Sequence, residues 1–227
     1  MSKYVESIKA VYQAHADPVA AGPMKAYMRN QFEYLGIKSP LQKELQKKFL
    51  AECGLPAISD LSGVLHELWE LPEREYQYMG IHILRKLEKK LPSEFIVTIE
   101  TLLTTKSWWD TVDTLASNTV GIHFRRFPDV KDRVISDWRR SENFWLRRTC
   151  LLFQLKYKGD TDFDLLCDLI RENLGEKEFF INKAIGWALR TYSRVDAEKI
   201  RTFVAETSLH PLSAREALKW LDRQKKK

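Results

Sequence analysis

The spacing of apolar residues is the feature of this sequence that most constrains its fold. Apolar side chains recur every three or four residues over long stretches, which is typical of amphipathic helices, and no long stretch alternates apolar and polar residues as a half-buried strand does. Proline and glycine separate these stretches, as they do at the starts and ends of helices. The sequence therefore predicts an all-α protein with helices over residues 4–15, 23–35, 40–53, 61–69, 73–91, 94–104, 108–124, 130–140, 143–156, 163–174, 177–192, 197–207 and 213–225.

Similar segments also recur at a regular distance along the chain. Aligning them gives successive spacings of 35, 33, 36, 35 and 32 residues between Leu41, Tyr76, Trp109, Trp145, Phe180 and Leu212. A period of this length is typical of helix hairpins that stack as a solenoid around one continuous core. We therefore expect a single domain over residues 1–227, with about six helical repeats and with residues 224–227 as a frayed basic tail. The alternative is an irregular helical bundle in which the spacing is accidental.

Positive charge is concentrated in the second half of the chain. The formal net charge is +6, and residues 1–113 contain 14 Lys and Arg against 15 Asp and Glu, whereas residues 114–227 contain 23 against 16. The second half also holds 13 arginines and the first half only 3. Because the guanidinium group pairs well with phosphate, this distribution favours a polyanionic partner, with nucleic acid first. The alternative is a basic surface that serves only solubility.

Several common classes of enzyme are excluded by what the sequence lacks. The chain has only 9 Gly and contains neither a GxGxxG nor a GxxxxGK[ST] motif, so we expect no nucleotide cofactor. Its 3 Cys form no CxxC pair and its 5 His do not stand at ligand spacing, which predicts no metal site. The odd number of cysteines and the start MSKYVESIKA, which has no long apolar stretch, predict a cytoplasmic protein.

Three cations occupy the same position in three consecutive repeats. Arg148, Lys183 and Arg215 each stand three residues after the aligned position of their repeat. Equivalent positions line up in a stack of repeats, and cations near helix N-termini favour phosphate, so we expect this row to bind a nucleic-acid backbone. The alternative is that these cations pair with local acids, such as Glu142, Glu178 and Glu216.

Two short motifs place aromatic and charged side chains on one helix face. Trp109 and Asp113 are four residues apart, and an indole face beside a carboxylate is suited to stabilising a positive charge. Trp187 and Arg190 are three residues apart, and Gly186 permits another group to approach the backbone closely. The alternative for both motifs is ordinary packing, with buried indoles and a solvated acid.

These motifs resemble a known family. The strings KSWWDTVD, FWLRRTCLLFQLKYK, KEFFINKAIGWALRTY and LPEREYQY, with YLGI near the N-terminus, resemble the AlkD-like alkylpurine DNA glycosylases, which remove alkylated bases from DNA. The resemblance runs from about Tyr4 to Trp220, which is nearly the whole chain. It implies a right-handed superhelical solenoid of HEAT-like antiparallel helix pairs, C-shaped, with double-stranded DNA in a basic concave channel.

The resemblance also implies roles for individual residues. Asp113 is expected to be the catalytic carboxylate, and the indoles of Trp109 and Trp187 are expected to bracket the deoxyribose of the damaged nucleotide. Related sequences often have paired basic residues where this chain has Gln42 and Lys43, so the chain departs from the family at one expected phosphate contact. Together with the row of cations, the expected DNA-binding residues are Tyr27, Lys43, Arg148, Lys183, Arg190 and Arg215.

The expected activity is hydrolysis of the N-glycosidic bond of cationic N3- or N7-alkylated purines, such as 7-methylguanine and 3-methyladenine, leaving an abasic site. A cationic base departs without a general acid, and a carboxylate with aromatic faces suits the oxocarbenium-like sugar that forms. We expect a monofunctional enzyme without cofactor or metal, and a monomer, because its channel must clasp a duplex. The alternatives are a non-catalytic HEAT-repeat protein that binds branched or distorted DNA and a protein-interaction scaffold.

Overall fold

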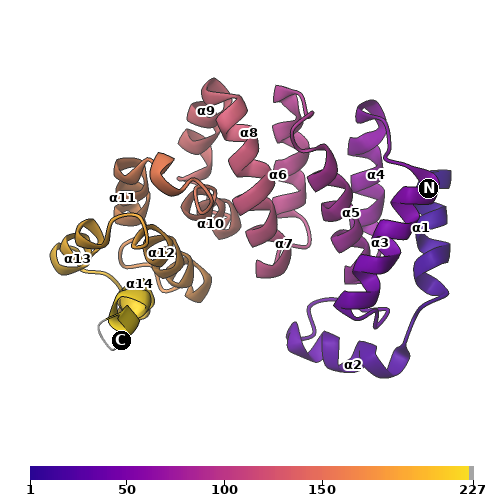
Figure 1. Ribbon diagram of the computed structural model, residues 1–227, viewed down its shortest axis with the longest axis horizontal. Helices are drawn as coiled ribbons and strands as arrows, with labels where there is room; N and C mark the ends of the chain where they lie inside the picture. Colours follow the sequence, from indigo (N-terminus) through magenta and orange to yellow (C-terminus); the bar gives the residue numbers. More distant parts are fainter. Residues whose placement is uncertain (225–227) are drawn as a thin grey trace. The chain divides into compact units, whose positions relative to one another are not determined.

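The computed structural model describes residues 1–224 and confirms an all-α protein (Figure 1). Within this range the chain forms α-helices joined by short turns, and the one strand-like pairing is an isolated bridge between Glu33 and Glu73. The last helix runs to Gln224, so the first residue of the predicted tail is helical. The rest of that tail, residues 225–227, lies outside the described residues.

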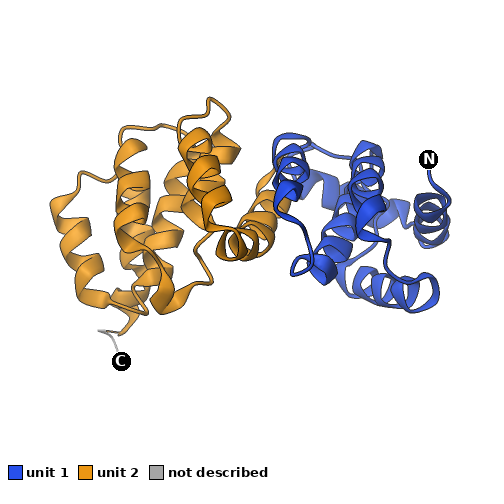
Figure 2. Cartoon of the chain, turned by 90° about the horizontal axis from the view of Figure 1, so that it is seen from above, with its two compact units in different colours: residues 1–106 blue, residues 107–227 orange. Residues whose placement is uncertain are grey.

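The chain divides into two compact units, Met1–Lys106 and Ser107–Lys227 (Figure 2). The prediction of one continuous domain, with a superhelical hand and a concave channel, stays a prediction. The first unit contains α1 (Lys3–Gln13), α2 (Pro18–Tyr27), α3 (Ser39–Cys53), α4 (Ile58–Glu70), α5 (Arg74–Leu87) and α6 (Ile96–Thr104). The second contains α7 (Trp109–Thr114), α8 (Gly121–Arg126), α9 (Pro128–Trp138), α10 (Phe144–Leu152), α11 (Phe163–Glu172), α12 (Phe179–Tyr192), α13 (Ala197–Glu206) and α14 (Pro211–Gln224).

The core of the first unit lies between α1, α3, α4 and α5. Tyr12 on α1 stacks on Tyr76 of α5 with 5.6 Å between ring centroids, and both rings are fully buried. Leu61 and Leu65 present the apolar face of α4 to the same core. Each fully buried side chain of this kind stabilises the fold by about 1.5–3 kcal/mol, so the amphipathic spacing in the sequence translates directly into helix packing.

A buried carboxylate holds the loop that leads into α3. Glu75 of α5 accepts hydrogen bonds from three successive backbone N–H groups, those of residues 35, 36 and 37, at 3.1, 2.9 and 3.1 Å. Burial raises the pKa of Glu75, and these backbone bonds oppose that rise. Gln42, at which the sequence departs from the expected pair of basic residues, is also buried and donates to the Glu75 carbonyl at 3.0 Å. Gln42 therefore joins α3 to α5 and does not face solvent.

The predicted helix over residues 23–35 is wrong in position. Helix α2 begins at Pro18, because the carboxylate of Asp17 accepts hydrogen bonds from two N–H groups of its first turn. Pro23, which was expected to start the helix, lies inside it. Arg29 and Asn30 then take positive φ angles of 55° and 57°, a left-handed conformation that ends the helix.

The predicted helix over residues 108–124 is present, but its middle is wider than an α-helix. A π-helical turn, Leu115–Val120, separates α7 from α8. Two side chains of this turn bond to carbonyls one turn back: Ser117 Oγ donates to Asp113 O at 2.8 Å and Asn118 Nδ2 donates to Thr114 O at 2.8 Å. Turns of this kind occur frequently at functional sites, and this one starts two residues after Asp113.

The bond set around Glu75 predicts the effect of removing its carboxylate. Glu75→Ala leaves three N–H groups without their acceptor, at about 1 kcal/mol or more each, so we expect the free energy of unfolding to fall by about 3 kcal/mol. Urea unfolding followed by circular dichroism measures this change. Glu44→Ala, on the exposed side of α3, is the matched control and should change stability by less than about 0.5 kcal/mol. An equal effect of the two variants would contradict this account of the loop.

Candidate active site

Asp113 and Arg148 form a buried, bidentate ion pair in the second unit. The Nε atom of Arg148 lies 2.7 Å from Oδ1 of Asp113, and Nη2 lies 2.8 Å from Oδ2. The pair joins α7, which carries Asp113, to α10, which carries Arg148; the side chains are 14% and 3% exposed. The third guanidinium nitrogen, Nη1, donates to the carbonyl of Phe180 on α12. One arginine therefore fixes the carboxylate relative to three helices.

An aromatic cluster packs beside this ion pair. The ring of Phe180 lies 5.1 Å from that of Trp108 and 5.0 Å from that of Trp145, between centroids. The ring of Phe144 is tilted against that of Trp145, with 4.6 Å between their centroids. The guanidinium carbon of Arg148 is 5.8 Å from the centre of the Phe180 ring. These rings keep water from one side of the pair, which strengthens its electrostatic attraction.

The environment of Asp113 determines its protonation. Burial raises the pKa of Asp113 above its ordinary value, the hydrogen bonds and charge of Arg148 oppose that rise, and Asp110 adds to it. Each oxygen accepts from a guanidinium that stays protonated, so the paired form of Asp113 is the carboxylate. Each oxygen also keeps a second lone pair, and the exposed part of the side chain gives a water molecule or substrate access to it.

The two predicted indoles lie on α7 and α12, the two helices to which Arg148 of α10 is hydrogen-bonded. Trp109 is the first residue of α7, one turn before Asp113, and is half-buried. Trp187, on α12, is half-buried as well, seven residues beyond Phe180. Residues seven apart share one helix face, so Trp187 stands on the face of α12 whose Phe180 contacts Arg148. Both residues are only partly buried, so each remains partly accessible to solvent.

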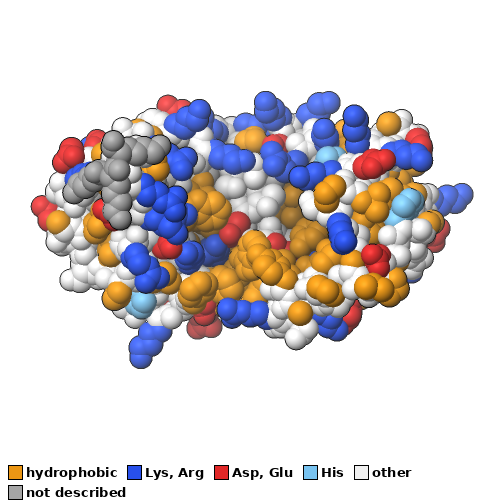
Figure 3. Space-filling view, turned by 60° about the horizontal axis from the view of Figure 1, so that its bottom comes forward, with side chains coloured by type: hydrophobic (Ala, Val, Ile, Leu, Met, Phe, Trp, Pro, Cys, Tyr) orange, Lys and Arg blue, Asp and Glu red, His pale blue; other side chains and the backbone are white. Residues whose placement is uncertain are grey.

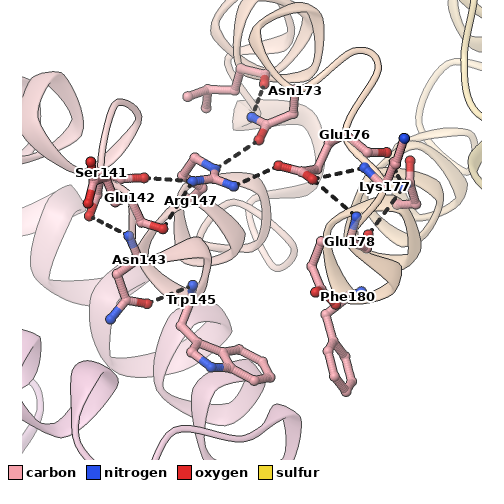
Figure 4. Close-up of polar contacts among 12 residues, drawn as sticks. Ser141, Glu142, Asn143, Trp145, Arg147, Asn173, Glu176, Lys177, Glu178 and Phe180 are labelled. Atoms are coloured by element: carbon pink, nitrogen blue, oxygen red, sulfur yellow. Dashed lines mark hydrogen bonds and ion pairs between the residues drawn. The ribbon is translucent and has the colours of Figure 1, made fainter.

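The neighbouring arginine, Arg147, has a different structural role (Figure 4). Its Nη2 donates to Glu176 Oε2 at 2.8 Å, its Nε to Asn173 Oδ1 at 3.3 Å, and its Nη1 to the Ser141 carbonyl at 2.7 Å. The other oxygen of Glu176 accepts hydrogen bonds from the backbone N–H groups of residues 177 and 178. These bonds lower the pKa of Glu176, and the bond from residue 178 contributes most to this change. Arg147 thus fixes the segment that leads into α12.

The predicted DNA-binding residues divide between the two units. Tyr27 is 74% exposed at the end of α2, and Lys43 is exposed on α3. In the second unit, Lys183 and Arg190 both pair with Glu216, as the alternative interpretation of the cations expected for Lys183. The other two acids named in that interpretation make different contacts. The backbone carbonyl of Glu142 accepts a hydrogen bond from Arg147, and the side chain of Glu178 caps α12.

Arg215 differs from the other two cations of the predicted row. It is exposed on α14, and no ion pair within residues 1–224 involves it. Arg148 is buried, and Lys183 shares its carboxylate with Arg190. The aligned repeat positions therefore hold cations in three different environments. Figure 3 shows Lys and Arg side chains gathered beside apolar ones on the part of the surface that belongs to the second unit.

Residues 1–224 also lack two kinds of feature. No group of three or more His, Cys, Asp or Glu side chains in this range has the arrangement of a metal site. No helix in this range is long and apolar enough to cross a membrane.

Comparison with known proteins identifies the family. The family model described as DNA alkylation repair enzyme matches residues 8–221, so the chain belongs to this family and is an enzyme with a role in the repair of alkylation damage. A solved structure of a predicted DNA alkylation repair enzyme from Enterococcus faecalis is 33% identical, with a TM-score of 0.84 over 91% of this chain and 96% of that chain. The search of curated proteins finds no match. The resemblance to this family is thus confirmed.

The ion pair predicts how the titration of Asp113 depends on Arg148. Arg148→Met removes the charge and hydrogen bonds that lower the pKa of Asp113, while burial still raises it, so the pKa should rise further. At a given pH below neutrality, a smaller fraction of Asp113 is then ionised. Carboxyl-carbon NMR of the wild type and the variant measures the shift. Arg147→Met is the matched control and should leave the pKa of Asp113 unchanged; the opposite order would contradict the assignment of the pair.

Proposed function

We propose that the protein is a monofunctional DNA glycosylase that hydrolyses the N-glycosidic bond of cationic N3- or N7-alkylated purines in duplex DNA and leaves an abasic site. The observation that carries this proposal is the buried Asp113 carboxylate, clamped by Arg148 and one helical turn from the indole of Trp109. Membership of the DNA alkylation repair family supports it.

The chemistry of the substrate explains why a carboxylate suffices. Alkylation of a purine at N3 or N7 places a positive charge on the base, so the base leaves as a neutral molecule when the glycosidic bond breaks. The electrons of that bond neutralise the base, and positive charge develops on the sugar as an oxocarbenium-like species. An anion beside the sugar stabilises this transition state more than the ground state. We assign this role to Asp113.

Asp113 also has the position to direct the attacking water. The Arg148 fork uses one lone pair on each oxygen, so the remaining lone pairs can orient a water molecule and accept its proton. Helix α7, with the sequence WDTVDT, contains no lysine. An amine for a Schiff base is therefore not supplied by the helix that carries Asp113, which favours simple hydrolysis over strand cleavage.

The half-buried indoles suit a sugar that becomes cationic. The face of an indole ring attracts positive charge through its quadrupole, and an apolar ring also excludes water from the reacting centre. We assign Trp109 and Trp187 to the two sides of the deoxyribose. The DNA backbone would be held by the basic residues Lys43, Lys183, Arg190 and Arg215 and by the exposed ring of Tyr27, in a protein that acts as a monomer without cofactor or metal.

Base release tests the enzyme and its carboxylate together. We expect the wild type to release 7-methylguanine from a duplex that contains a single such lesion, and Asp113→Asn to reduce the single-turnover rate at least about 100-fold, because the anion that stabilises the transition state is lost. Released base is measured by chromatography. Asp137→Asn, which removes an exposed carboxylate of α9, is the matched control and should keep the wild-type rate.

Two outcomes would overturn parts of this proposal. Wild-type protein that binds the duplex but releases no base would favour the alternative of a non-catalytic protein that binds distorted DNA. A wild-type rate in Asp113→Asn would remove Asp113 from the catalytic role.

The charge of the leaving base should determine which lesions are released. Uracil is neutral and departs as an anion unless an acid protonates it, and the site pairs its carboxylate with an arginine that does not give up its proton. We therefore expect release of uracil to be at least about 1,000-fold slower than release of 7-methylguanine, which corresponds to about 4 kcal/mol in activation free energy. Efficient release of uracil by the purified protein would refute this mechanism.

A further inference from the structure

A buried carboxylate on α14 gathers three cations next to the face of α12 that carries Trp187. Oε1 of Glu216 lies 2.9 Å from Nζ of Lys183 and 3.7 Å from Nζ of Lys219, and Oε2 pairs with Nη1 of Arg190. The side chain of Glu216 is only 7% exposed, whereas those of Lys183, Arg190 and Lys219 are 38%, 25% and 48% exposed. The anion is therefore inside and the cations are at the surface.

The close packing of α12 on α14 explains how Glu216 reaches these cations. A Cβ atom at Gly186 would lie 2.5 Å from Cβ of Glu216 and 2.9 Å from the carbonyl oxygen of Ser213, so only glycine allows the two helices to approach this closely. The Ser213 hydroxyl donates to the Asn182 carbonyl at 2.9 Å and ties the helices together at the same level. Lys183 and Arg190 lie on α12, one on each side of Gly186 in the sequence, so Glu216 lies between them.

The charges of this group do not cancel. Hydrogen bonding to Lys183, followed by Arg190 and the charges of both, lowers the pKa of Glu216 to about 2, against the effect of its burial, so it is an anion at neutral pH. Three cations around one anion leave two positive charges in excess. Lysine and arginine have three and five N–H donors, and the contacts with Glu216 use only part of them. The group therefore retains both charge and donors for an anion from solution.

We propose that Glu216 is a positioning residue that holds Lys183, Arg190 and Lys219 together as a binding site for one phosphate of the DNA backbone. This inference rests on the proposed function, because it assumes DNA as the ligand. Three like charges repel each other and separate unless an anion lies between them. Ordering one such side chain on binding costs about 0.5–1.5 kcal/mol of conformational entropy, and this cost is avoided for a side chain that is already ordered. The carboxylate therefore increases DNA affinity although its own charge repels phosphate.

The sign of this effect distinguishes the proposal from a simple effect of net charge. Glu216→Gln raises the net charge by one, which by itself should tighten DNA binding; we expect it to weaken binding to an undamaged duplex about five- to tenfold, because the cations separate. Asp222→Asn makes the same change of charge at an exposed position of α14 and should leave binding unchanged or tighter. Fluorescence anisotropy at several salt concentrations measures the DNA affinity of both variants. The slope of the logarithm of affinity against the logarithm of salt concentration should fall by the equivalent of about one phosphate contact for Glu216→Gln and stay unchanged for Asp222→Asn.

A double-mutant cycle tests the role of the carboxylate in a second way. Lys219→Met should weaken DNA binding when Glu216 is present. In the Glu216→Gln background, the same substitution should change the binding free energy by at most half as much, because Lys219 is no longer held in place. Thermal unfolding monitors the folding of each variant, and Lys219→Met, at a largely exposed position, keeps the site testable if Glu216→Gln unfolds.

The outcomes separate this proposal from the proposed function. Tighter binding by Glu216→Gln, equal to that of Asp222→Asn, overturns the positioning role and leaves the glycosylase proposal intact. Additive effects of Lys219→Met and Glu216→Gln also overturn it. A wild type that binds duplex DNA but releases no 7-methylguanine refutes the proposed reaction without affecting the phosphate site. Absence of binding by the wild type contradicts both.

Discussion

The ion pair between Asp113 and Arg148 is the interaction on which the arrangement of the second unit around the site depends. Two buried charges are tolerated only as a pair with satisfied hydrogen bonds, and removing one partner from such a pair typically costs about 3–5 kcal/mol. Because Arg148 also donates to the Phe180 carbonyl, the same requirement fixes α12 relative to α7 and α10. An apolar replacement of similar volume is often as stable as a buried pair, so stability alone does not explain why these charges are there. The chemical role that we propose for the carboxylate would explain them.

Neighbouring cations serve different purposes because a helix turns by about 100° per residue. Arg148 points towards Asp113, whereas Arg147 is bound by Glu176, Asn173 and the carbonyl of residue 141. A count of positive charge treats these two arginines as equal. In the structure one orients a carboxylate, the other orients the start of α12, and both are too engaged with protein groups to act as free surface charges.

The sequence was sufficient to predict the helices whose spacing is locally determined, and it also paired Trp109 with Asp113 on one face. It was insufficient where two local signals compete: both Pro18 and Pro23 suit the first turn of a helix, and the carboxylate of Asp17 decides in favour of the former. The π-helical turn after α7 depends on side chains that bond back to the main chain, which apolar periodicity does not reveal. The pairing of Asp113 with Arg148 joins residues 35 apart in the sequence. Local patterns do not predict such a contact, and only an alignment of the repeats indicates that the two positions are neighbours.

The pairing of Asp113 with an arginine also constrains the chemistry of the proposed reaction. An isolated buried carboxylate takes up a proton readily, and in that form it can act as an acid towards a leaving base. The guanidinium opposes protonation of Asp113 and is itself too weak an acid to protonate a base. The pair is neutral as a whole, so its field decays quickly with distance and acts mainly on a group in direct contact with the carboxylate. In the proposed reaction, such a site would stabilise a cationic sugar but would not assist the departure of a neutral base, and the positive charge that alkylation adds to a purine removes the need for that assistance.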